Sequence, residues 1–389
     1  MLWQHYVFRR GPEVNDMWES AFARRPARLL YIAGRGFDYR EQAVMRSFVA
    51  SCKEAGQSVQ NAELLLVGFE GYQLTGELKQ QTAENAEALT EQFRTLGPTT
   101  SLDIGFSAAG EDDISANNAL RLGTAEVLKK VTDQTDIILD VSSLPRVVYL
   151  ALMTGILSKL IPDKTARNAL SSSGINFQVL VAEDAALDAH ILSEDPSNDL
   201  VLIPGFSSAL HAESLRDWPL VWFPILGEKR MNQLQKVMES EIPIYAEICP
   251  IVPHPSRDLR RADRLLVEYK LPLFDTRGTP TGNILYAHES NPFEAYRQLL
   301  GAMERYRDSM SIIGGCRLVV TPLGSKLITI GAGLACFEMR PSTMGEQFVV
   351  AIPYAHPTRY VASTTSLRES KPDICVLVLT GEAYAYNTT

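Results

Sequence analysis

The stretch DIILDVSSLPRVVYLALM, residues 136–153, begins like a buried strand and continues like a buried helix. Its apolar residues 137–139 lie between two aspartates, which favours a short strand buried on both faces. Serine is a common helix cap and proline fits the first helical turn, so the segment SSLP indicates a helix start. A buried strand that leads through a short polar loop into a helix is typical of a parallel α/β sheet.

The same alternation of short apolar runs and longer amphipathic segments extends over nearly the whole chain. In the first half, we predict strands at residues 28–33, 63–68, 101–106, 136–140, 177–182 and 200–204. In the second half, we predict strands at residues 220–226, 244–252, 283–288, 317–322, 347–353 and 374–379. The alternation breaks near residues 205–218. The sequence therefore predicts an α/β protein of two Rossmann-like domains with mostly parallel sheets, residues 1–210 and residues 211–389.

Composition narrows the classes of function. The chain has 389 residues, 37 of them basic and 46 acidic, and its net charge of −9 argues against an extensive nucleic-acid groove. The five cysteines form no CxxC pair, so neither a zinc site nor a disulfide framework is predicted. The N-terminal residues lack the order of a signal peptide, and no apolar run is long enough to span a bilayer. We therefore expect a cytoplasmic protein without a membrane segment.

Polar residues crowd the junction between the strand at 136–140 and the following helix. Parallel α/β sheets bind ligands beyond the carboxyl ends of their strands, where helix N-termini favour anions. Asp140 could accept ribose or base hydrogens, while Ser142, Ser143 and Arg146 could donate to phosphate. The alternative is plain capping, in which Ser143 closes the helix and Asp140 accepts N–H groups of the turn. Both interpretations are open from the sequence.

Asp140, Ser142 and Arg146 also fit the pattern [DN]-x-[ST]-x-x-x-[RK]. This segment resembles the one that follows the fourth strand of CARF domains, Rossmann-like sensors of cyclic oligonucleotides in bacterial and archaeal antiviral systems. The resemblance covers at most residues 28–205. It implies a ligand pocket between two protomers, and hence a dimer that binds a nucleotide second messenger.

A second polar junction follows the predicted strand at 28–33, in the segment AGRGFDYRE. Gly34 and Gly36 allow a tight turn and a close backbone approach, and Arg35, Asp38 and Arg40 place charge at the same edge. The alternative is a tight turn in which Asp38 caps the helix. The segment also resembles the GxGxDxR opening of leucine-carboxyl-methyltransferase-like proteins, which implies S-adenosylmethionine as cofactor. The sequence downstream does not continue that family's pattern.

The second half contains a similar junction in RLVVTPLGSKLITIG, residues 317–331. Gly324, Ser325 and Lys326 lie where a predicted strand passes into a helix, which is a plausible anion site although it is not a Walker A loop. The alternative is a helix capped by Ser325 with Lys326 in solvent.

The sequence contains no clear motif of a catalytic effector domain, the kind of domain that would act once a sensor has bound its ligand. The segment VEYK, residues 267–270, matches half of the PD-(D/E)xK nuclease motif, but that motif needs a strand and a second acid for Mg²⁺, whereas this segment has helical periodicity. We expect a nucleotide- or phosphate-binding sensor or regulatory protein of a bacterial defence or stress system, acting as a homodimer or through a protein partner. A methyltransferase-like group-transfer enzyme, a Mg²⁺-dependent nuclease and a purely structural subunit are the alternatives. The sequence leaves open whether the chain is an enzyme, and which ligand or cofactor it binds.

Overall fold

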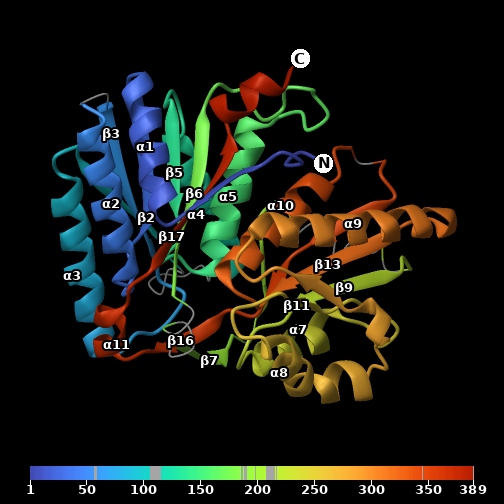
Figure 1. The fold of residues 1–389 in the computed structure, drawn as a ribbon. Helices are drawn as coiled ribbons and strands as arrows, with labels where there is room; N and C mark the ends of the chain where they lie inside the picture. The colour runs from blue at the N-terminus through green and yellow to red at the C-terminus, as the bar shows by residue number, and fades with distance from the viewer. Residues whose placement is uncertain are drawn as a thin grey trace. The chain divides into compact units, whose positions relative to one another are not determined.

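The computed structural model describes residues 1–56, 59–105, 115–184, 187, 191–197, 199–206, 215, 217–343 and 345–388. The chain forms two compact units. The first unit combines Met1–Glu194 with Thr358–Thr389, and the second unit is Asp195–Pro357. Each unit is built on its own β-sheet (Figure 1).

The sheet of the first unit has seven strands in the order β1-β17-β6-β5-β2-β3-β4. Their bounds are β1 (Val7–Arg10), β2 (Ala27–Gly34), β3 (Val59–Phe69), β4 (Thr99–Ile104), β5 (Asp136–Asp140), β6 (Asn176–Glu183) and β17 (Asp373–Thr380). Strands β2 to β6 pair in parallel, whereas β17 is antiparallel to both β6 and β1. Numbered along the chain, the five parallel strands lie in the order 3-2-1-4-5, which is the Rossmann order.

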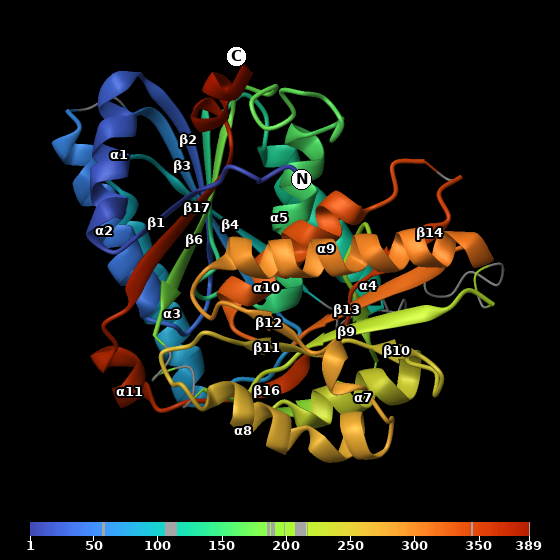
Figure 2. The ribbon, with the colours of Figure 1, turned by 45° about the vertical axis from the view of Figure 1, so that its right-hand side comes forward.

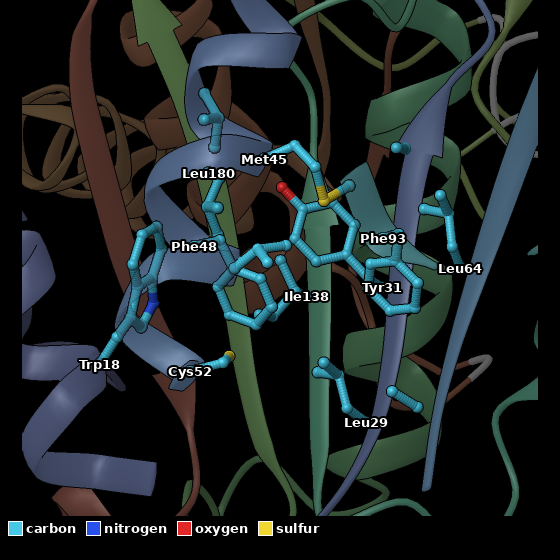
Figure 3. Close-up of a cluster of buried hydrophobic side chains, with 14 of the residues drawn as sticks. Trp18, Leu29, Tyr31, Met45, Phe48, Cys52, Leu64, Phe93, Ile138 and Leu180 are labelled. Carbon is cyan, nitrogen blue, oxygen red and sulfur yellow. The ribbon is translucent and has the colours of Figure 1, made fainter. Parts of the chain in front are cut away.

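Helices cover both faces of this sheet (Figure 1). One face carries α1 (Pro12–Arg24), α2 (Arg40–Glu54) and α3 (Gly76–Phe93), and the other carries α4 (Ala116–Lys130) and α5 (Arg146–Leu160). Alternate residues of β2 point to opposite faces, so Leu29 and Tyr31 enter the core beneath α1 and α2. There the ring of Phe48 meets those of Trp18 and Tyr31, each at 5.1 Å between centroids (Figure 3). These strands are buried on both faces, as the runs of apolar residues predict.

The sheet of the second unit repeats the strand order. Its main strands are β9 (Leu220–Ile225), β11 (Ile251–Pro253), β12 (Leu285–Ala287), β13 (Cys316–Pro322) and β14 (Phe348–Ala351), and they lie in the order β12-β11-β9-β13-β14. All of these pairs are parallel, so this sheet also has the order 3-2-1-4-5. Its helices are α7 (Met231–Glu241), α8 (Arg261–Glu268), α9 (Pro292–Met310) and α10 (Lys326–Met339) (Figure 2).

Short elements complete the two units. They are β7 (Leu192–Pro196), β8 (Val201–Leu202), β10 (Glu247–Ile248), β15 (Pro353–Tyr354), β16 (Pro357–Val361) and α11 (Thr364–Glu369), with a π-helical turn at Lys270–Asp275 and 3₁₀ turns at Thr281–Asn283, Ser311–Ile313 and Glu382–Thr388. Strand β10 pairs with β9 at Val221 and Trp222, and β11 pairs with β9 further along, at Ile225. Among the described residues, none of the helices combines the length and the apolar character that a membrane crossing requires.

The predicted fold class is confirmed, but the structure divides the chain differently. The segment predicted as the last strand of the second domain is β17, which lies in the sheet of the first unit. Residues 211–389 therefore do not form one domain, and the expected boundary at residue 210 lies outside the described residues. An apolar strand sequence reports burial on both faces, and it does not report which sheet the strand joins.

Two predicted strands are also interrupted or shortened. The one expected at 244–252 is split into β10 and β11, because Pro250 has no N–H to donate to a neighbouring strand. The one expected at 200–204 contains only the two-residue strand β8, which pairs with β15 outside the main sheets.

Candidate ligand site at the carboxyl edge of the first sheet

The first sheet has its topological switch point between β2 and β5, where the strand order reverses. In Rossmann-like sheets the ligand lies at this point, beyond the carboxyl ends of the strands. The loops that leave β2 and β5 here contain most of the predicted site residues, so their contacts decide how the site is built.

Glu41 joins the two loops. It lies in the first turn of α2 and is fully buried. Its Oε1 accepts a hydrogen bond from the backbone N–H of Gly34 at 2.8 Å, and its Oε2 accepts one from the hydroxyl of Ser143 at 2.5 Å. Burial and the nearby carboxylate of Asp140 raise the pKa of Glu41 well above its usual value, although the two hydrogen bonds oppose the shift. Glu41 therefore links the loop after β2 to the loop after β5.

Asp140 and Ser142 also point into the protein. Tyr31 Oη donates to Asp140 Oδ2 at 3.0 Å, and the Ser142 N–H donates to Asp140 Oδ1 at 2.9 Å. The Ser142 hydroxyl oxygen accepts a hydrogen bond from the N–H of Ala182 in β6 at 2.9 Å. Both side chains are fully buried, so Asp140 holds the turn, as the capping interpretation predicts. Ser143 differs from that interpretation: it bonds Glu41, and α5 begins at Arg146 after Pro145.

Asp38 and Arg40 bond to each other. The guanidinium of Arg40 contacts both carboxylate oxygens of Asp38 at 2.7 to 3.1 Å, and the pair is buried. The Arg40 N–H also donates to Asp38 Oδ1 at 3.1 Å. Asn85 of α3 donates to the carbonyl of Gly36 at 2.9 Å and so ties the loop to the next helix. This charge pair holds the shape of the loop, and its contact with a ligand stays a prediction.

The glycines of the loop are required by close packing. A Cβ atom on Gly34 would lie 2.3 Å from Ser143 Oγ and 3.1 Å from the backbone nitrogen of Leu144. A Cβ on Gly36 would lie 2.9 Å from Ser143 Cβ. The sequence indicates that these glycines allow a close approach. The partner in this structure is the loop after β5, which occupies the space between the two strand ends.

Two arginines lie at the outer side of this frame. Arg35 extends past Gly68 of β3 and forms an ion pair of 2.5 Å with Asp103 of β4, with both side chains about one third to two fifths exposed. Arg146 is the first residue of α5 and is partly exposed. No described side chain caps the N-terminus of α5. Arg35 and Arg146 are thus partly exposed to solvent, and of the predicted phosphate donors Ser143 is partly exposed as well.

The second sheet has an equivalent edge. A Cβ on Gly227, after β9, would lie 2.1 Å from the carbonyl oxygen of Leu323, after β13, so these loops are also in direct contact. Ser325 caps α10 by accepting a hydrogen bond from the N–H of Ile328 at 3.4 Å. Gly324 packs against Ile225, and Lys326 is the first residue of α10. The capping alternative therefore describes Ser325.

The carboxyl edge of the second sheet also contains an ion cluster that the sequence does not predict. Arg261 of α8 contacts Glu228 with both ends of its guanidinium, at 2.5 and 2.8 Å, and also pairs with Glu289. Burial disfavours ionisation of Glu228, but the hydrogen bonds and charge of Arg261 outweigh burial and lower its pKa. The cluster joins the loops after β9 and β12 to α8. The basic residues near 257–264 indicate that charged contacts form here. The sequence does not show that Arg261 pairs with Glu228 and Glu289, because both lie far from it in sequence.

The alternative of a Mg²⁺-dependent nuclease gains no support from the geometry of the described residues. Glu268 lies in α8 and accepts the N–H of Lys229, while Lys270 begins the π-helical turn and pairs with Asp275 at 3.6 Å. The segment is helical, as predicted, and not the strand that the nuclease motif needs. Within the described part of the chain, no three histidine, cysteine or acidic side chains are grouped as metal ligands.

The buried state of Glu41 gives a testable pH dependence. A raised pKa means that folding favours the protonated carboxyl, so this contribution is complete below the ordinary pKa of 4.5 and is lost as pH rises toward the folded-state pKa. Relative to a Glu41→Gln variant, the wild type should therefore lose thermal stability as the pH rises above the ordinary glutamate pKa of 4.5. Unfolding temperatures of both proteins across a series of pH values measure this, with Glu54→Gln at the exposed end of α2 as control. A difference that does not change with pH would contradict the assignment.

Comparisons with known proteins provide little beyond the geometry. No protein-family model matches the chain, and no curated protein matches it. Among solved structures, the chain is similar to a "Putative Universal Stress Protein from Pseudomonas aeruginosa UCBPP-PA14", at 11% identity over 90% of this chain and 97% of that chain, with a TM-score of 0.23. A TM-score this low carries no argument, so the Rossmann-like assignment rests on the strand orders of the two sheets.

Proposed function

We propose that the first unit binds a nucleotide-like ligand through its phosphate at the N-terminus of α5, and that the protein is a sensor or regulatory protein. The observation that carries the proposal is the start of α5. This helix begins at the switch point of a 3-2-1-4-5 sheet, its first residue is Arg146, and no described side chain caps it. A helix N-terminus presents N–H groups and positive dipole to an anion, and an arginine beside it adds paired donors.

The helices of the molecule begin in two ways. Thr75, Ser115, Asn291 and Ser325 cap α3, α4, α9 and α10 with their side chains, whereas no described side chain caps α1, α2, α7 or α8. In α5 the corresponding position is Pro145, whose side chain has no acceptor. A helix start at the switch point that relies on no such side chain is suited to an external anion.

The buried side-chain contacts beneath the candidate site favour a binding function over a catalytic one. Asp38, Arg40, Asp140 and Glu41 all form buried contacts within the protein, and so the loops are fixed before a ligand arrives. A site with fixed loops binds without a large ordering cost. The buried acids are directed toward neighbouring protein groups, so the arrangement supplies anchoring more readily than acid–base chemistry.

The resemblance to CARF domains supports a cyclic oligonucleotide as the ligand class and a bacterial antiviral or stress response as the setting. In this proposal the protein acts as a homodimer or with a protein partner, in the cytoplasm. Native mass spectrometry of the purified protein measures the oligomeric state. Denaturing mass spectrometry of released small molecules identifies a ligand that co-purifies.

Arg146→Ala should weaken nucleotide binding by about 1.5–3 kcal/mol, or roughly 10- to 150-fold in Kd, because a guanidinium–phosphate contact is charge-assisted. Isothermal titration with ATP, cyclic oligoadenylates and S-adenosylmethionine measures the effect. Arg28→Ala is the matched control, since Arg28 lies exposed on β2 at the opposite end of the strand and pairs with Asp133. Failure of every nucleotide to bind the wild type would refute the proposal. Binding of S-adenosylmethionine alone would favour the methyltransferase-like alternative.

A further inference from the structure

A segment from the C-terminal part of the chain crosses the carboxyl edge of the first sheet. We define the strap as residues 358–370, which belong to the first unit and lead to β17. The backbone of the strap pairs with the loop after β3. Gln73 N–H donates to the carbonyl of Thr358 at 2.6 Å, and Tyr360 N–H donates to the carbonyl of Gln73 at 3.4 Å. The strap thus lies beside the loop after β3, the strand that pairs with β2 in the sheet.

Tyr360 of the strap contacts the loop after β2 and the loop after β3. Its ring centroid lies 5.9 Å from that of Phe37, which follows the glycine turn after β2. It lies 5.0 Å from the ring of Tyr72, in the loop after β3, with an interplanar angle of 84°. Phe69, the last residue of β3, is 5.7 Å from Tyr72. Aromatic rings from three separate segments therefore meet at the edge of the sheet.

The two tyrosines are only partly buried, whereas Phe37 and Phe69 are buried beneath them. Burial raises the pKa of Tyr72 to about 12, and the positive charge of Arg35 opposes this shift. Tyr72 is therefore neutral at physiological pH, with a guanidinium in its neighbourhood. Partly exposed aromatic rings next to a positive charge form the chemical surface on which nucleobases stack.

The far end of the strap is anchored separately. Leu367 of α11 is buried in an apolar cluster with Phe37, Leu78 and Leu187. Thr364 donates to Glu77 at 2.5 Å, and Arg368 pairs with Glu84 at 3.3 Å, but these contacts are exposed and contribute little to stability. The strap is held by Leu367, by the contacts of Tyr360, and by Arg368, which donates to Tyr39 Oη at 3.1 Å before the start of α2. Tyr360 brings a partly exposed aromatic ring to the loops after β2 and β3.

We propose that the nucleobase of the bound nucleotide stacks on the ring of Tyr360, against which the nearly perpendicular ring of Tyr72 packs, and that the strap contacts the ligand through Tyr360. This inference rests on the proposed function and specifies its ligand class: the site recognises a base as well as a phosphate. It also makes the C-terminal segment, more than 280 positions from Tyr72, a part of the binding site. Stacking tolerates different bases, because every base presents an aromatic face.

Two probes separate the base from the phosphates: ATP and inorganic tripolyphosphate. Tyr360→Ala should raise the Kd for ATP about ten-fold and leave the Kd for tripolyphosphate unchanged, because only ATP contains a base. Tyr360→Phe should bind ATP like the wild type, because it keeps the ring. Tyr245→Ala, which removes a tyrosine that is 71% exposed in the second unit, is the control. Isothermal titration measures all four proteins.

Hydrogen exchange on the wild type tests the strap without any substitution. ATP should increase the protection of residues 358–370, and tripolyphosphate should not. If the wild type binds ATP while Tyr360→Ala binds it equally well and the strap gains no protection, the inference is wrong and the proposed function stands. If the wild type binds no nucleotide at all, the proposed function fails and this inference fails with it.

Discussion

Replacing Glu41 with alanine should lower the free energy of unfolding by about 2–5 kcal/mol. The substitution leaves the buried N–H of Gly34 and the half-buried hydroxyl of Ser143 without their acceptor, and such a loss costs about 1–3 kcal/mol for a fully buried group. The removed side chain is fully buried, so a cavity adds to the cost. Urea denaturation monitored by circular dichroism measures the change.

Glu54→Ala serves as the matched control for Glu41→Ala. Both glutamates lie in α2, but Glu54 is exposed in its last turn, so its loss should change stability by less than about 0.5 kcal/mol. Glu41→Ala should also weaken nucleotide binding, because the loops after β2 and β5 lose their common anchor. Equal stabilities for the two variants would show that Glu41 does not hold the loops.

Gly227→Ala should destabilise the second unit by about 1–3 kcal/mol or more, which is the range for overpacking. The added Cβ would lie 2.1 Å from the carbonyl oxygen of Leu323 and 2.9 Å from its carbonyl carbon. These are backbone atoms at the start of the loop that leads into α10, so they cannot rotate away as a flexible side chain can. Thermal unfolding followed by limited proteolysis locates the loss in the second unit.

Gly282→Ala is the control for this substitution. Gly282 lies in the same unit, in the 3₁₀ turn Thr281–Asn283, and no other atom lies within 4 Å of its added Cβ. Alanine there should be neutral or slightly stabilising, since it reduces the entropy of the unfolded chain. A Gly227→Ala protein as stable as Gly282→Ala would mean that the two loops are not in close contact.

The parallel strands of both sheets are predicted well because their sequences state their environment directly. DIILD, residues 136–140, is β5 without adjustment, since an apolar run between polar turns has few alternatives. The edge strand β1 escapes prediction because VFRR has no clear periodicity. The membership of β17 escapes it as well, because the pairing of a strand depends on the partners available in three dimensions and not on its own residues.

The sequence predicts which polar residues lie at the edge of the sheet, but it does not predict their contacts. Polar residues at strand ends mark the edge of the sheet, and this edge is where Asp140 and Asp38 lie. The sequence does not show that the carboxylate of Asp140 accepts a hydrogen bond from Tyr31, or that the carboxylate of Asp38 accepts hydrogen bonds from Arg40. Glu41 has the sequence pattern of an ordinary first-turn acid, and its burial follows from the approach of Ser143. Tyr360 is distant in sequence from the loops it contacts.

The placement of β17 also affects how the protein is made. Both ends of the chain contribute to one sheet: β1 near the N-terminus pairs with β17 near the C-terminus, and β17 fills the position beside β6. A ribosome that has synthesised the first five parallel strands must still produce the entire second unit before that sheet can close. Until then the edge of β6 presents unpaired backbone groups, which are a template for wrong pairing. The edge of β6 therefore stays open to wrong pairing until β17 has been synthesised.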